Sequence, residues 1–149
     1  MAITSNRISQ KNIVTQPYSR VDIGGSDLET VSGDGGWVRL TANQKFMAYV
    51  TIGAYDAADT LDTLQIEEAK NSSGLGAQVL TTKSITLLAA DVVDGAVFVL
   101  ECDGSELEDL YGYVRINAAE SLDTGVDEVS VVYIRDKGDG ELTESNARV

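Results

Sequence analysis

Apolar side chains recur at every second position in a series of short segments, and this spacing is what most constrains the fold of the chain. The clearest segment is 45–53 (KFMAYVTIG), whose even-numbered positions put four apolar side chains on one face: Phe46, Ala48, Val50 and Ile52. Successive side chains of a β-strand point to opposite faces of a sheet, so the pattern predicts a strand. The opposite face, with Met47, Tyr49 and Thr51, is also mostly apolar. We therefore expect a central strand that is covered on both faces.

Strand-like segments of the same kind occur along most of the chain and are separated by turn-forming Gly, Asp, Asn and Ser residues. Only short helical pieces are expected, the best being residues 105–110, where Ser105 and Glu108 have the spacing of a capping box. About eight strands, spaced by roughly 8 to 15 residues, predict an all-β fold, a single-domain β-sandwich or jelly roll. Besides 45–53, we expect strands at 20–23, 37–41, 63–68, 78–80, 84–88, 97–102, 111–117 and 128–135.

Charge is distributed unevenly along the chain. The first 20 residues contain Arg7, Lys11 and Arg20 and no acidic residue, whereas the other 129 contain 24 acidic and 8 basic residues. The two parts carry formal charges of +3 and −16, which sum to the −13 of the whole chain. This asymmetry predicts an extended N-terminal docking arm at 1–20, which precedes the β-sandwich domain at 21–136. Residues 137–149, which are Gly-rich and polar and follow the last expected strand, predict a C-terminal tail.

The acidic balance and the apolar runs limit the partners. The 11 Lys and Arg residues are scattered singly, so they cannot form the continuous basic stripe that nucleic acid requires. An anionic membrane surface is disfavoured for the same reason, and apolar runs such as 96–100 are much shorter than a membrane span. We expect no secretory signal, because the N-terminal residues lack an apolar core. The single cysteine, Cys102, excludes an internal disulfide and is expected to be an inert core thiol.

The residues needed for common catalytic chemistry are scarce. The chain contains no histidine, which removes the commonest general base and the usual partner of a nucleophilic Ser or Cys. Neighbouring acids such as Glu67 and Glu68 occur, but a chain this rich in acids produces such pairs by chance. Residues 101–109 and 136–141 contain oxygen ligands suited to calcium, yet neither follows the EF-hand pattern. We therefore expect no enzyme, no catalytic residue, no bound metal and no cofactor.

The aromatic residues suggest an alternative of a different function class. A set of this kind can form a stacking platform for sugars, although Tyr and Trp more often fill a β-sandwich core or an interface. We favour core or interface and keep a carbohydrate-binding β-sandwich module as the alternative. The residues concerned are Trp37, Tyr49, Tyr55, Tyr111, Tyr113 and Tyr133.

The order of these segments resembles that of small capsid decoration, or cement, proteins of tailed bacteriophages. A polar arm precedes a strand-rich body, which contains an extended segment with a Ser/Gly loop at 65–85 (QIEEAKNSSGLGAQVLTTKSI) and strands at 96–102 (AVFVLEC) and 111–115 (YGYVR). The likeness is one of pattern and covers about residues 20–135. Members of such families are β-rich and non-enzymatic and bind the outer capsid lattice, often as trimers. The resemblance implies a virion structural protein, assembled in the host cytoplasm, whose partners are the major capsid protein and itself, as a homotrimer.

Physical reasoning from the residues agrees with such a role. Many equivalent weak contacts on a repeating lattice become strong together, and an arm can pair with an exposed sheet edge of a neighbour. A head–tail connector, neck or tail component of a phage has the same requirements and remains an alternative, whereas a carboxylate-dependent hydrolase is remote. Within the arm, the residues expected to contact the partner are apolar or basic: Ile3, Arg7, Ile8, Lys11, Ile13, Val14 and Arg20.

Overall fold

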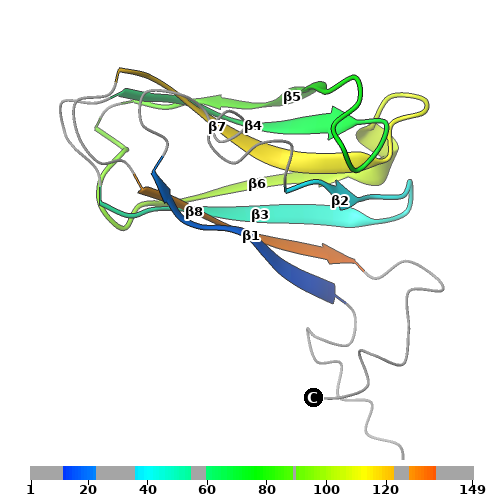
Figure 1. Ribbon diagram of the computed structural model, residues 1–149, viewed down its shortest axis with the longest axis horizontal. Coiled ribbons are helices and arrows are strands. Elements are labelled where there is room, and N and C mark those ends of the chain that lie inside the picture. Colours follow the sequence, from blue (N-terminus) through cyan, green and yellow to red (C-terminus); the bar gives the residue numbers. More distant parts are fainter. Residues whose placement is uncertain (1–11, 23–35, 55–59, 89, 123–127, 137–149) are drawn as a thin grey trace, which may run out of the picture.

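The computed structural model describes residues 12–22, 36–54, 60–88, 90–122 and 128–136, which form two stacked β-sheets (Figure 1). A single turn of 3-10 helix, η1 (Gly104–Glu106), follows the sixth strand. The prediction of an all-β, single-domain sandwich with about eight strands is confirmed. The strands of the described part are β1 (Asn12–Asp22), β2 (Val38–Arg39), β3 (Lys45–Ile52), β4 (Thr60–Ala69), β5 (Gln78–Thr86), β6 (Val97–Asp103), β7 (Tyr113–Leu122) and β8 (Glu128–Asp136).

The strand order is that of a jelly roll. The first sheet has the order β1-β8-β3-β6 and the second sheet the order β2-β7-β4-β5. All neighbouring strands are antiparallel. The pairs are nested, because β1 pairs with β8, β2 with β7, β3 with β6 and β4 with β5. A long hairpin wrapped into two sheets in this way gives the jelly-roll topology.

The core lies between the two sheets and follows the predicted alternation. In β3 the four even-numbered positions are at most 1% exposed, and they pack against inward-facing residues of β4, β7 and β8. β3 is central in its sheet, as expected, with β8 on one side and β6 on the other. The expectation that β3 is covered on both faces is not met within the described residues, because Tyr49 on its outer face is 37% exposed.

Two local expectations were wrong. The segments expected at 78–80 and 84–88 form one strand, β5, which has an irregular register against β4 and a positive φ of 71° at Thr82. The expected capped helix at 105–110 is replaced by η1, which begins one residue earlier. Its capping carboxylate belongs to Glu106, which accepts a hydrogen bond from the N–H of Asp103 at 2.7 Å. Gly104 permits this turn, because a Cβ atom there would overlap the carbonyl oxygen of Thr41.

Part of the segment that we assigned to the arm lies in the sheet. Residues 12–20 belong to β1, which pairs with β8 from Asn12 opposite Asp136 to Asp22 opposite Glu128. The pairing is irregular on both sides of Tyr18. Residues 1–11 of the expected arm and the expected tail, 137–149, lie outside the described residues.

Candidate interaction surface

The outer face of the first sheet carries a continuous band of apolar side chains. Cross-strand register creates this band, because Tyr49 of β3 lies opposite both Val99 of β6 and Val132 of β8. One step along the strands, Met47 of β3 lies opposite Ile134 of β8. We call these side chains the outer band: Val14, Met47, Tyr49, Val97, Val99, Val132 and Ile134.

Much of the outer band is open to solvent in the described structure. The exposed fractions are 57% for Val14, 55% for Val97, 46% for Val99 and 37% for Tyr49. An antiparallel sheet with one face in water normally places polar side chains on that face. Single exposed apolar residues are common on proteins, but a contiguous patch across several strands indicates an interaction site.

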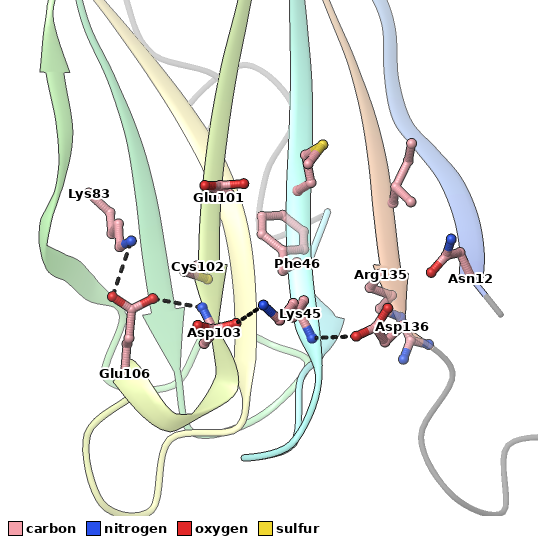
Figure 2. Close-up of a pocket in the computed structure, with 12 residues that line it drawn as sticks. Asn12, Lys45, Phe46, Lys83, Glu101, Cys102, Asp103, Glu106, Arg135 and Asp136 are labelled. Carbon is pink, nitrogen blue, oxygen red and sulfur yellow. Dashed lines mark hydrogen bonds and ion pairs between the residues drawn. The ribbon is translucent and has the colours of Figure 1, made fainter. Parts of the chain in front are cut away.

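A cavity of about 340 Å³ lies at one end of the first sheet, and charged groups surround it (Figure 2). The Nζ atom of Lys83 lies 3.1 Å from Glu106, and the Nζ atom of Lys45 lies 3.8 Å from Asp103. The backbone N–H of Lys45 donates to the carboxylate of Asp136 at 3.2 Å. Three of the acidic side chains around this cavity therefore already have cationic or N–H partners within the chain.

Two titratable groups at the cavity, Glu106 and Cys102, have shifted pKa values. The N–H of Asp103 and the ammonium of Lys83 hold the pKa of the Glu106 carboxyl below its ordinary value of 4.5. Burial, reinforced by the charge of Glu106, raises the pKa of the Cys102 thiol to about 12. A general acid needs a raised carboxyl pKa, and a nucleophilic cysteine needs a lowered thiol pKa. The pKa shifts at this cavity have the opposite directions, and Cys102 is the buried thiol that the sequence predicted.

The neighbouring carboxylates of β4 both have hydrogen-bond partners within the chain. Glu67 accepts a hydrogen bond from Nε of Arg115 at 2.8 Å, and both side chains are buried. Glu68 points to the opposite face of the strand, where it accepts hydrogen bonds from Nε2 of Gln78 at 2.8 Å and from the N–H of Glu108 at 2.9 Å. Each carboxylate thus compensates for its burial through separate partners.

No metal site is found among the described residues, where no group of three or more Cys, Asp and Glu side chains could hold an ion. The calcium loop considered at 101–109 contributes Asp103 and Glu106, and both lie beside lysines. In the second loop considered, 136–141, only Asp136 is within the described residues.

The described aromatic residues lie in different environments, although Trp37 and Tyr111 both adjoin the loop that contains Gly74 and Gly76. Tyr133 is fully buried in the core, whereas Tyr49 lies in the outer band. Trp37 stacks on the guanidinium of a β7 arginine, and Tyr111 donates a hydrogen bond to a loop carbonyl. Tyr55 lies outside the described residues.

The expected partner-binding residues are placed only in part. Ile13 is half-buried in β1, Val14 belongs to the outer band, and Arg20 also lies in β1. The outer band itself was missed by the sequence reasoning, because the apolar odd-numbered positions of 45–53 were interpreted as a second covered face. Four expected residues lie outside the described part: Ile3, Arg7, Ile8 and Lys11.

Comparison with protein-family models and with curated proteins found no match for this chain. Within the residues that the structure describes, no helix has the length and apolar character needed to cross a membrane.

Proposed function

We propose that this protein is a non-enzymatic virion component that decorates and stabilises the head of a tailed bacteriophage. Its main partner in this proposal is the major capsid protein, and its contact surface is the outer band. The observation that carries the proposal is the apolar outer band across the four strands of the first sheet. Its members on β1, β3 and β6 include solvent-exposed side chains, and its two members on β8 are half-buried. The resemblance to decoration proteins in segment order supplies the virion context.

The outer band suits a lattice better than a single isolated partner. The largest apolar patch on a typical monomer is about 300–600 Å² and is often functional, and burial of such an area contributes about 7–15 kcal/mol. Loss of translational and rotational freedom costs about 4–15 kcal/mol, so one contact of this size gives weak binding. Several linked copies on a repeating surface convert weak contacts into stable attachment.

The fold and the charge are compatible with this role. Jelly rolls occur in viral capsid domains and also in lectins, so the fold is compatible with both capsid decoration and carbohydrate binding. A sugar site needs a concave surface that carries aromatic and polar groups. The outer band contains a single aromatic residue, Tyr49, among aliphatic side chains and Met47, so it is poorly suited to bind a sugar. The net charge of −13 supports solubility at the high local concentration of a decorated particle.

The test is binding of purified variants to phage heads that lack the protein. Val14→Glu places a charge in the outer band, and we expect it to weaken binding at least about tenfold, because the charge would lose its water on contact. Val79→Glu is the matched control, since Val79 is 42% exposed on the edge strand β5 of the other sheet. Equal binding of the two variants would contradict the outer band as the contact surface. Failure of the unmodified protein to bind heads would reject decoration altogether.

A head–tail connector, neck or tail component is the closest competing proposal, and copy number separates it from decoration. Decoration requires hundreds of copies per particle, whereas a ring at the portal vertex holds about six or twelve. Quantitative mass spectrometry of purified particles gives this number directly.

A further inference from the structure

The four edge strands of the described sheets differ in how well they are protected against pairing with another chain. β1 contains Pro17 and an irregular register, β2 is only two residues long, and β5 contains a register shift and Lys83. Natural edges are blunted by these devices: proline, bulges, lysine and shortness. β6 (VFVLECD) has none of them and runs for seven residues in regular register with β3. β6 is therefore the edge that remains suited to strand addition.

The backbone of β6 shows where an added strand would bind. Ala96 and Gly104, which flank β6, both hydrogen-bond toward β3 and the turn before it. Backbone groups of successive residues in an edge strand point alternately toward and away from the neighbouring strand. The even-numbered residues from Ala96 to Gly104 therefore face β3, and the N–H and C=O groups of the odd-numbered residues between them, from Val97 to Glu101, point away from it. The next group in this series, the N–H of Asp103, is already taken by the carboxylate of Glu106. The open edge thus runs from Val97 to Glu101 and ends at Asp103.

We infer that residues 3–9 of a second copy of this chain add to β6 as a fifth strand, parallel to it. Ile3 and Arg7 are four residues apart, as are Val97 and Glu101, so both pairs share one face of an extended strand. A parallel register puts Ile3 beside Val97 and Arg7 beside Glu101, which matches apolar with apolar and cation with anion. The antiparallel register through the same four residues would put Arg7 beside Val97 and Ile3 beside Glu101. Residues 1–11 contain no Gly, Pro or acidic residue that would oppose this pairing.

Strand spacing indicates that the added segment comes from another copy. In the parallel register Ser9 lies beside Asp103, and three residues further along the chain Asn12 begins β1 at the opposite edge of the sheet. The added strand and β1 are four strand spacings apart, about 19 Å. Three extended residues span only about 11 Å. A chain therefore cannot place its own residues 3–9 on its own β6 in this register.

This exchange is head-to-tail, so copies form a ring if the rotation closes. This inference rests on the proposed function for its biological purpose. It adds to that function by identifying β6 of a neighbouring copy as the binding site of the N-terminal arm. The homotrimer expected from the resemblance is one such ring. Its test needs only the purified protein, so it remains separate from the capsid-binding experiment.

The first experiment compares the full chain with a chain that lacks residues 1–11, by sedimentation over a range of concentrations. The truncation ends before Asn12, so the whole of β1 is retained. We expect the full chain to associate reversibly and the truncated chain to sediment as a monomer. A full chain that stays monomeric, or a truncated chain that associates equally well, would overturn the inference.

The second experiment locates the contact by disulfide cross-linking. Ser5→Cys and Val99→Cys place thiols on adjacent strands, where the Cα–Cα separation of about 4.8 Å permits a disulfide. When the two single variants are mixed and oxidised, we expect a covalent heterodimer to form at least about tenfold faster than with Val14→Cys, which places a thiol on the opposite edge of the first sheet. Similar rates for the two partners, or no cross-link with Val99→Cys, would refute β6 as the receptor. In a chain that carries both Ser5→Cys and Val99→Cys, a cross-link confined to monomers would refute exchange between copies.

A charge reversal checks the register. Arg7→Glu and Glu101→Arg should each weaken self-association about two- to fivefold, as expected for an exposed ion pair, and the double variant should restore it. Asp109→Arg, an exposed acid in the turn before Tyr111, is the control and should leave association unchanged. Additive losses in the double variant would contradict the proposed pairing of Arg7 with Glu101.

Discussion

The hydroxyl of Tyr133, a residue of the first sheet, accepts a hydrogen bond from the backbone N–H of Ile116 in the second sheet at 2.9 Å. The described part of β2 pairs with β7 only at Tyr113 and Val114, so a side chain takes the place of a further strand partner at Ile116. The Tyr133 ring also packs edge-on against Phe46, with ring centroids 4.9 Å apart. One fully buried side chain thus links the two sheets by both packing and hydrogen bonding.

Tyr133→Phe should therefore destabilise the fold although it removes a single oxygen atom. The substitution leaves the N–H of Ile116 buried without this acceptor, which costs about 1–3 kcal/mol. The free energy of unfolding in urea measures the effect. Tyr49→Phe, on the exposed outer band, is the control and should change stability by less than about 0.5 kcal/mol. Equal stability of the two variants would contradict the structural role of the Tyr133 hydroxyl.

Arg115→Ala should be one of the most damaging substitutions in the chain. It removes the cationic partner of the buried Glu67 carboxylate, whose other hydrogen-bond donors among the described residues are neutral amide side chains such as that of Gln65. It also removes the guanidinium whose central carbon lies 4.4 Å from the centroid of the Trp37 ring. Breaking a buried ion pair in this way costs about 3–5 kcal/mol. Arg39→Ala, at an exposed position of β2, provides the comparison and should have little effect. A loss below about 1 kcal/mol for Arg115→Ala would show that Glu67 is solvated in solution.

The Cys102 thiol should be unreactive in the folded protein. With its pKa raised to about 12 by burial, only about 1 in 10⁴ molecules carries the thiolate at pH 8. Reaction with an aromatic disulfide reagent should be at least about a thousandfold slower in buffer than in denaturing urea, where the thiol titrates normally. Comparable rates in the two conditions would mean that β6 opens readily, which would also weaken the case for β6 as a regular edge.

Glu106 should contribute to the loss of stability in acid. Its folded pKa is lower than its ordinary value of 4.5, so the folded state favours the ionised carboxylate. The stabilisation is present above pH 4.5 and disappears as the pH falls through the lowered folded pKa. Glu106→Gln should remove this part of the pH dependence and reduce the slope of stability against pH in that range. An unchanged slope would show that the ion pair with Lys83 and the bond to Asp103 have no net effect in solution.

Sequence reasoning predicted the fold class because alternation along a strand reports directly on burial. The buried face of 45–53 was identified residue by residue, since each even-numbered position carries an apolar side chain. Nested strand order was not predictable, because pairing between β1 and β8 depends on contacts between residues more than 100 positions apart. The start of η1 was not predictable either, because it depends on the close approach of Gly104 to Thr41, which are distant in sequence and meet only in the folded chain.

The interaction surface was harder to predict than the fold. An apolar outer face and a second buried face have the same sequence pattern, so nothing in the sequence indicated that Tyr49 would be exposed. The boundary of the arm was placed at residue 20 because charge changes there. β1 nevertheless begins at Asn12, because Tyr18 supplies a buried side chain to the core. Charge patterning therefore did not locate the element boundary.

Electron cryomicroscopy of native particles tests the central claim most directly. Our account predicts density for this jelly roll in hundreds of copies on the outside of the head. In that density the outer band, from Val14 to Val99, should be buried against the capsid lattice. A map in which the outer band faces open solvent in every copy, or in which the chain occurs only as a small ring at the portal vertex, would contradict it.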